Sequence, residues 1–185
     1  DQILDPKYSK KSGTVTGEIL NEINHKVESH QLRSQGIKEL IGVGVSNFAH
    51  STESRKHNVF NAITKYDGQI VHQGEEFSFN ALLKSATAEN GFVLSKVILG
   101  GASRWGWGGG VCQVSTTLFR SIFNAGLPVT ARRNHSFPVK YYDPQGFDAT
   151  IYLGQQDLKF LNTTPGDVMI QFVVAGDDLI TFLYG

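Results

Sequence analysis

Residues 108–128 read GGGVCQVSTTLFRSIFNAGLP and join a run of glycines to a periodic apolar stretch. After the glycines, apolar residues recur at intervals of three or four, which is the spacing of one helix face; they are Val111, Val114, Leu118, Ile122 and Ala125. Gly126 and Pro128 then end the periodic stretch. The sequence therefore predicts a largely buried helix over 111–125 that begins directly after a glycine loop.

Two more helices are predicted upstream of this one. Residues 14–33 carry apolar residues at intervals of three to five, as an amphipathic helix does. Residues 51–66 show a similar pattern, with Ser51 or Thr52 as the N-terminal cap. The first dozen residues are polar and carry Lys, Ser, Pro and Gly, a composition typical of a linker.

The remaining segments have the character of strands and loops. The apolar pattern over residues 37–48 predicts a strand, although Gly42 and Gly44 weaken that pattern. The pattern over residues 69–79 predicts one or two short strands. The segment GGASRWGWGGG at 100–110 is predicted to be a loop, since six of its eleven residues are glycine. An apolar stretch at 92–99 precedes that loop, and strands are predicted after the buried helix at 129–133, 136–142, 149–153, 168–174 and 179–183.

These elements predict the α+β fold class. With 185 residues, one domain is the default expectation. We expect the helix over 111–125 to pack on an antiparallel sheet made chiefly of residues after Val129. The strands that carry His135 and Asp148 are expected to be neighbours joined by a short loop.

The overall composition excludes several function classes. Lys and Arg total 17 and Asp and Glu total 17, so no net field would draw the chain to nucleic acid. No histidine spacing matches a metal site, and the glycine loop lacks the Gly-Lys-Ser/Thr ending of a phosphate loop, so neither metal nor cofactor is expected. No apolar run approaches the roughly 20 residues that span a bilayer, and a membrane would be reached only through a segment absent from this chain.

Cys112 is the candidate nucleophile because it stands where the glycines give way to the predicted helix. Unpaired backbone N–H groups and the helix dipole favour an anion at that position, and a thiolate is such an anion. The backbone N–H groups near Gly110, Cys112 and Gln113 are candidates to bind an oxyanion. The alternative is that this single cysteine is a small buried apolar residue.

His135 and Asp148 are the candidates for base and orienting group. A catalytic cysteine needs an imidazole within reach and a third group that orients the imidazole. The chain order Cys, His, Asp also occurs in papain-like and transglutaminase-like folds, an analogy of arrangement only. Strand alternation would place His135 on an apolar face and Asp148 on a polar face, so a bulge or a strand end would be needed to join them. For each residue the alternative is a structural hydrogen bond.

Five further residues are candidates to contact a substrate. Arg132 and Arg133 precede the histidine, and either guanidinium could hold a carboxylate or simply be solvated. Ser136 follows the histidine directly. Trp105 and Trp107 could form an aromatic wall over the site, or could pack to anchor the glycines.

Longer stretches resemble the VanW family of bacterial cell-envelope proteins. They are GGGVCQVSTTLFRSIFNAGLPV, RRNHSFPVKYYDPQGFDATIYLGQQDLKFLNTT, RKHNVFNAITKYDGQIVHQGEEFSFNALL and ENGFVLSKVILGG. The resemblance assigns residues 37–185 to a VanW-like domain and leaves 1–36 as an N-terminal linker and helix. The chain departs from the family pattern where Ala131 replaces a common Glu and where RWGW precedes the glycines.

The resemblance implies a secreted or membrane-anchored protein of mostly Gram-positive bacteria. VanW-type domains have been connected with glycopeptide resistance and with L,D-transpeptidation of peptidoglycan stem peptides. Cys112 matches the family cysteine, and His135 and Asp148 match the histidine and aspartate of its HS and DAT motifs. The expected function is a cysteine-dependent L,D-transpeptidase outside the cytoplasm. The alternatives are a peptidoglycan peptidase and a non-catalytic module that binds peptidoglycan or a glycopeptide.

Overall fold

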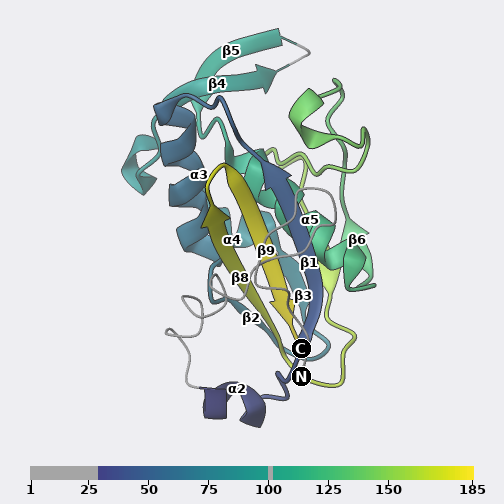
Figure 1. Ribbon diagram of the computed structural model, residues 1–185. Coiled ribbons are helices and arrows are strands. Elements are labelled where there is room, and N and C mark those ends of the chain that lie inside the picture. Colours follow the sequence, from purple (N-terminus) through teal and green to yellow (C-terminus); the bar gives the residue numbers. More distant parts are fainter. Residues whose placement is uncertain (1–28, 100–101) are drawn as a thin grey trace.

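The fold is built on a four-stranded antiparallel sheet with the strand order β1-β9-β8-β2 (Figure 1). A computed structural model describes residues 29–99 and 102–185. The strands of this sheet are β1 (Leu40–Asn47), β2 (Ile70–Val71), β8 (Val168–Ala175) and β9 (Asp178–Tyr184). The predicted α+β class with antiparallel pairing is confirmed.

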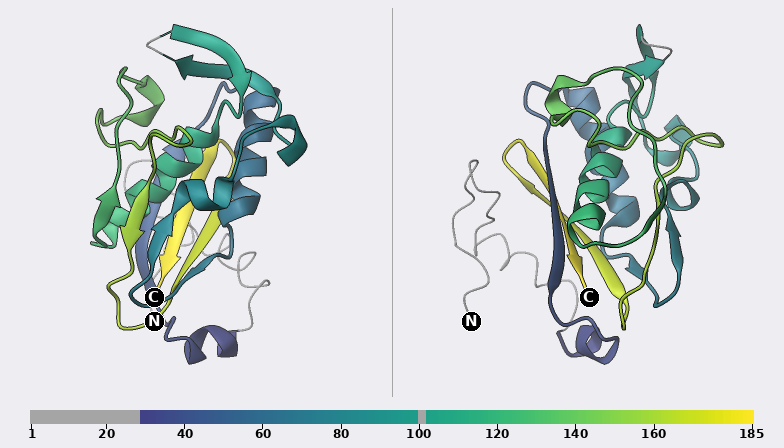
Figure 2. Two further views of the ribbon diagram at one scale, coloured as in Figure 1. Left: turned by 180° about the vertical axis from the view of Figure 1, so that it is seen from behind. Right: turned by 90° about the vertical axis from the view of Figure 1, so that its right-hand side faces the viewer.

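Two helices cover one face of this sheet (Figure 2). They are α3 (Glu53–Tyr66) and α5 (Val111–Asn124). Beyond them lies a second antiparallel sheet in the order β3-β7-β6, formed by β3 (Glu76–Ser78), β7 (Lys159–Leu161) and β6 (Val129–Ala131). The rings of Phe77 and Phe160 stack between β3 and β7 at 5.1 Å, and Tyr66 of α3 stacks on Phe79 at 4.0 Å. Helix α5 is thus buried along most of its length, whereas α3 buries one face and exposes the other.

Helix α5 confirms the prediction made from its apolar spacing. Val114, Leu118 and Ile122 have no exposed surface, and polar residues between them are buried as well. Gly110 occupies the N-terminal cap position with a φ of 119°, a backbone conformation that side chains other than glycine rarely adopt. Helix α3 is also confirmed, since the side chain of Thr52 caps it by accepting a hydrogen bond from the Arg55 N–H at 3.3 Å.

The two glycines of β1 allow the strand and α5 to touch backbone to backbone. A Cβ atom at Gly44 would lie 2.0 Å from the Thr117 carbonyl oxygen and 2.6 Å from the Ser121 nitrogen. At Gly42 a Cβ atom would lie 2.4 Å from the Ser121 carbonyl oxygen. Gly42 and Gly44 weaken the strand pattern in the sequence, and their lack of a side chain allows the helix to pack closely on the sheet.

The remaining elements are short. A hairpin of β4 (Leu94–Leu99) and β5 (Ala102–Trp107) projects at one end of the molecule (Figure 1). The other elements are α2 (Ser29–Ser34), α4 (Phe79–Leu83) and the 3-10 turns η1 (Ala88–Asn90) and η2 (Lys140–Tyr142). Of the helix predicted over 14–33, only the part from Ser29 lies within the described residues. No helix among the described residues is long and apolar enough to cross a membrane.

Several sequence predictions are wrong in detail. Residues 102–107 form a strand rather than part of a loop, because they pair along their whole length with β4. Residues 136–142 and 149–153 are not strands, and the segment after β6 is a long connection whose backbone groups bond to side chains of α5 instead of a sheet. The main sheet also takes two of its four strands from before residue 129.

Replacing Gly44 with alanine should destabilise the fold, because the new methyl group would collide with the backbone of α5. Overpacking of this kind costs about 1–3 kcal/mol in free energy of unfolding. The measurement is denaturant-induced unfolding, with Glu39→Ala at an exposed position just before the same strand as the control. A Gly44→Ala protein as stable as wild type would contradict the close contact.

Candidate functional site

Cys112 lies in the first turn of α5, at the bottom of a pocket of about 470 Å³. The loop that follows Asp148 lies directly over its sulfur. The Ile151 N–H donates a hydrogen bond to Cys112 Sγ at 3.4 Å, and Thr150 Oγ1 lies 4.0 Å from the same atom. Cys112 as a residue is partly exposed and lines the pocket, which favours a reactive thiol over a cysteine sealed in the core.

His135 and Asp148 form a hydrogen-bonded pair beside this cysteine. Asp148 Oδ2 is bonded to His135 Nδ1, and the same oxygen accepts the His135 backbone N–H at 3.0 Å. Because Nδ1 is held by the carboxylate, Nε2 is the ring nitrogen left to interact with Cys112. The strand alternation that seemed to separate the two residues does not apply, since both lie in the long connection after β6.

The electrostatics of the group favour a charged Cys112–His135 pair. Burial by itself raises the pKa of Cys112, but its hydrogen bond and charge interaction with His135, together with the Ile151 N–H, lower it below the ordinary value. Burial by itself lowers the pKa of His135, but the bonds to Asp148 and Cys112 raise it to about 9. A thiolate and an imidazolium therefore coexist over the pH range between these two pKa values.

Asp148 is the anionic end of this arrangement. Only 4% of its surface is exposed, and burial by itself would raise its pKa. The hydrogen bonds and the charge of His135, with a contribution from Arg132, lower the pKa instead. Arg132 Nη2 lies 3.9 Å from Asp148 Oδ1, and Arg132 Nε donates to the Asp148 carbonyl oxygen at 2.7 Å. Arg132 thus holds Asp148 in position. It does not line the pocket around Cys112.

The glycines before Cys112 are required by close packing. A Cβ atom at Gly109 would lie 2.4 Å from the Lys96 carbonyl oxygen, and one at Gly110 would lie 2.9 Å from the Arg55 carbonyl oxygen. The Gln113 N–H is occupied, because it donates to the Gly110 carbonyl oxygen at 2.9 Å. Among the described residues, no backbone carbonyl oxygen accepts the Cys112 N–H, so it is the better candidate of the two to bind an oxyanion.

Gln113 has a supporting position. Its side chain is fully buried, its amide nitrogen donates to Ser46 Oγ at 2.5 Å and to the Asn47 carbonyl oxygen at 3.3 Å, and its amide oxygen accepts from Arg55 at 2.8 Å. The contact of the Gln113 backbone with substrate stays a prediction, and its N–H is held by the Gly110 carbonyl oxygen. The side chain instead fixes the first turn of α5 to β1 and α3.

The other predicted substrate residues are spread over three places. Trp107 lines the pocket of Cys112, whereas Trp105 lies outside it, 66% exposed, with Lys96 Nζ 4.8 Å from its ring centroid. Ser136 lines a separate pocket of about 180 Å³, which also reaches His135 and Asp148. Arg133 is exposed, and its carbonyl oxygen accepts the Thr150 N–H at 2.8 Å.

Several residues that shape the site were not identified from the sequence. Arg55, Tyr141, Tyr142 and Thr150 line the pocket with Cys112 and His135. The Tyr142 ring lies 5.3 Å from the His135 ring, and Arg55 lies 5.0 Å from the centroid of Tyr141. A signal was present for two of them, since Arg55 opens the family-like stretch RKHNVFNAI and Thr150 ends the DAT triplet.

Arg120 is a further missed residue, and it holds the long connection in place. Its guanidinium, on the buried side of α5, donates to four carbonyl oxygens: Val45 at 2.7 Å, Tyr142 at 2.6 Å, Asp143 at 3.1 Å and Phe147 at 3.2 Å. One side chain therefore ties the helix that carries Cys112 to β1 and to the segment that leads into Asp148. Among the described residues, no group of three His, Cys, Asp or Glu side chains is placed to hold a metal ion.

Comparison with known proteins finds a matching family model and related proteins. A family model described as "VanW like protein" matches residues 54–184. The chain is 35% identical over 159 residues to the "Uncharacterized protein YoaR" of Bacillus subtilis (strain 168), covering 86% of this chain and 52% of that protein. It is 32% identical over 130 residues to the "Vancomycin B-type resistance protein VanW" of Enterococcus faecalis (strain ATCC 700802 / V583), covering 68% of this chain and 46% of that protein.

The chain spans about half the length of the curated relatives it matches. No solved structure matches it significantly.

The thiol of Cys112 should ionise below the pKa of about 8.5 that a free cysteine has. Since the thiolate is the species that reacts, the rate of alkylation by iodoacetamide should reach half its plateau below that pH. His135→Ala removes the cation that stabilises the thiolate and should shift the midpoint upward, and Asp148→Asn should shift it less. His72→Ala is the matched control, because His72 forms an exposed pair with Asp167 at 3.0 Å. A wild-type midpoint near 8.5 that His135→Ala leaves unchanged would refute the pairing.

Arg120→Met should loosen the connection that carries the site, because four buried or partly buried carbonyl oxygens lose their donor. We expect the free energy of unfolding to fall by about 2–4 kcal/mol and alkylation of Cys112 at neutral pH to slow. Calorimetry and alkylation rates measure the two effects, with Arg104→Met on the exposed face of the hairpin as the control. Unchanged stability would show that Arg120 does not anchor the connection.

Proposed function

The chain belongs to the VanW family, and we propose that it is a cysteine acyltransferase of the L,D-transpeptidase type that acts on peptidoglycan stem peptides. The observation that carries the proposal is the Cys112–His135–Asp148 arrangement at the start of a buried helix, inside a pocket. A nucleophile, an imidazole and an orienting carboxylate in contact are what covalent acyl transfer requires.

The first half of the reaction would form a thioester. The Cys112 thiolate attacks the carbonyl carbon of an amide bond, and the oxygen becomes an oxyanion that the Cys112 N–H at the helix terminus is placed to stabilise. His135 gives its Nε2 proton to the departing amine as the carbon–nitrogen bond breaks. The acyl group remains on sulfur, and an amino acid or amine leaves. Asp148 keeps the imidazole oriented and its proton on the correct nitrogen throughout.

The second half would return the enzyme to its starting state. An incoming amine loses a proton to His135, attacks the thioester carbonyl carbon and forms a new amide as the carbon–sulfur bond breaks. The thiolate and the imidazolium are then restored. With a neighbouring stem peptide as the amine donor the product is a cross-link, whereas water in the same position gives a shortened stem peptide. The same residues serve both outcomes. A peptidase would therefore differ from the proposed transpeptidase only in the molecule that accepts the acyl group.

The substrate class rests on family membership and on the pocket. One relative is described as a vancomycin B-type resistance protein, which supports a substrate in the cell wall as part of this proposal. The pocket has room for a few amino-acid residues, and its wall combines aromatic side chains with groups that can donate hydrogen bonds. Acting on stem peptides would place the chain in the cell envelope, outside the cytoplasm.

One observation favours a second candidate, a non-catalytic module that binds peptidoglycan. Trp105 is 66% exposed and Trp107 is 46% exposed, and their positions two residues apart on β5 put both rings on one face of the hairpin. Exposed aromatic rings of this kind contact sugars and peptides. This candidate requires no reaction at Cys112, and the test below separates it from the enzyme.

Incubation with disaccharide-tetrapeptide should make the wild-type protein release the terminal amino acid and form either cross-linked dimers or tripeptides. Cys112→Ala should abolish both products, because no other cysteine is present in the sequence to accept the acyl group. His135→Ala should lower turnover by roughly a hundredfold or more, and Asp148→Ala by less, as expected for a proton carrier and an orienting group. Chromatography with mass detection follows the products.

An acyl adduct on Cys112, seen by mass spectrometry when turnover is slow, would identify the intermediate. Wild-type turnover in a folded Cys112→Ala protein would contradict the proposed enzyme. Binding of the fragment without any turnover, lost on replacement of Trp105 and Trp107, would favour the non-catalytic module instead.

A further inference from the structure

We infer that Arg55 forms a carboxylate-binding subsite beside Cys112, so that the preferred acyl donor is a peptide cut at its last amide bond, next to a free C-terminal carboxylate. The inference deepens the proposed function and rests on it for the identity of the donor. The subsite itself rests on three features of the pocket: the placement of Arg55, its hydrogen-bond partners and the charges around it.

Arg55 is held against the start of α5. It lies in the first turn of α3, and a Cβ atom added to Gly110 would lie 2.9 Å from the Arg55 carbonyl oxygen and 3.2 Å from its Cγ atom. Gly110 is two residues before Cys112. The Arg55 side chain then continues to Gln113, where its Nη2 donates to the side-chain oxygen at 2.8 Å. Arg55 therefore reaches residues on both sides of the cysteine in the sequence and lines the same pocket.

The partners of Arg55 hold its guanidinium in position without neutralising its positive charge. Nη1 donates to Ser51 Oγ at 2.7 Å, Nη2 donates to the Gln113 amide, and the guanidinium lies over the Tyr141 ring at 5.0 Å. These partners are all uncharged. The Tyr142 side chain, which is also uncharged, forms a further hydrogen bond with Arg55. A guanidinium has five N–H donors, and these three bonds still leave donors for a ligand. A fork of this kind that is already held in place is suited to bind a carboxylate through two parallel bonds.

The charge of the pocket points to an anionic ligand. Its described lining includes the cationic groups of Arg55, Lys96 and His135 and no Asp or Glu. In the described part of the chain, no carboxylate lies within 4.0 Å of Arg55, whereas Lys56, the next residue on α3, pairs with Glu53 at 3.1 Å. The charge of the thiolate is matched by the imidazolium, so the charge of Arg55 remains for the substrate.

This placement determines which bond is cut. In the last residue of a peptide, the carboxylate is separated from the amide nitrogen by one Cα atom. A carboxylate held at Arg55 would bring the amide before it to the neighbouring Cys112, and the residue that leaves would be a free amino acid. A peptide that continues beyond this position, or that ends in a carboxamide, offers no anion to Arg55 and should be a poor donor.

Two alkylating reagents test the subsite without any peptide. Iodoacetate carries a carboxylate and iodoacetamide is its neutral counterpart, and with both the Cys112 thiolate displaces iodide. The ratio of their rates cancels any change in the thiolate fraction. We expect this ratio, relative to that of N-acetylcysteine, to be about tenfold higher in the wild-type protein, which corresponds to about 1.4 kcal/mol. Arg55→Met should bring the ratio to that of N-acetylcysteine, and Arg55→Lys should give an intermediate value.

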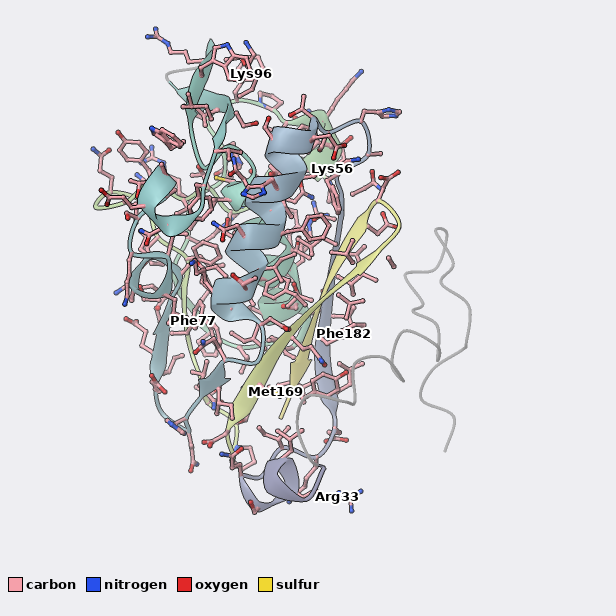
Figure 3. All side chains as sticks on the ribbon, turned by 90° about the vertical axis from the view of Figure 1, so that its left-hand side faces the viewer. Arg33, Lys56, Phe77, Lys96, Met169 and Phe182 are labelled. Carbon is pink, nitrogen blue, oxygen red and sulfur yellow. The ribbon has the colours of Figure 1, made fainter. Side chains whose placement is uncertain are left out.

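Lys56→Met is the matched control, because Lys56 follows Arg55 on α3, where Figure 3 labels it. Lys56 does not line the pocket. It should keep the wild-type ratio. Equal ratios in the wild-type protein and in a folded Arg55→Met or Arg55→Gln protein would overturn the subsite, whatever the protein does with peptides.

The second measurement compares a tetrapeptide that has a free C-terminus with its C-terminal carboxamide. The wild-type kcat/KM should favour the free acid by about tenfold or more, and Arg55→Met should remove this preference while retaining slow turnover. If neither peptide is turned over but iodoacetate is still preferred, the subsite stands and the transpeptidase proposal fails. If both peptides are turned over equally well by the wild-type protein, the acyltransferase stands and the inferred subsite fails.

Discussion

The backbone of β1 touches the backbone of α5, with no side chain between them, and the position of the site depends on this contact. Only glycine permits it at residues 42 and 44. The contact sets the distance of α5 from the sheet. Gln113 and Arg120 of the helix add hydrogen bonds to Ser46 and Val45 of β1. The cysteine is positioned by a packed helix and strand, which is what the proposed nucleophilic role would require.

The remaining groups of the site come from a connection that has little regular structure of its own. Its course is set by side chains of α5, since Arg120 bonds to three of its carbonyl oxygens and Ser115 donates to the Ala149 carbonyl oxygen at 2.7 Å. Once the connection is in place, Asp148, His135 and Cys112 shift one another's pKa values in the directions that favour charge separation. The helix thus supplies the proposed nucleophile and also positions the two residues that lower the pKa of its thiol or support that effect.

The parts of the fold that follow from local pattern could be predicted from the sequence. Apolar spacing and the residues at the helix ends are enough to predict five elements, which are α3, α5, β1, β8 and β9. The connection after β6 could not be predicted, because its apolar residues look like strands while its hydrogen bonds go to α5. The sequence also predicts Cys112, His135 and Asp148 as site residues, because their side-chain chemistry and their order in the chain match a cysteine, a base and an orienting carboxylate. Arg55 was not, because its part in the pocket depends on packing between two helices that no spacing rule describes.

The contacts that build the site join residues far apart in the chain. Arg55 and Gln113 are separated by 58 positions, Cys112 and Thr150 by 38, and Val45 and Arg120 by 75. Contacts of such separation form only after the loops between them have closed, which is slow compared with the formation of a single helix. The surroundings that lower the pKa of the Cys112 thiol therefore exist only where these distant segments have come together. The lowered pKa is a property of the whole fold, and the short segment that carries the cysteine does not possess it alone.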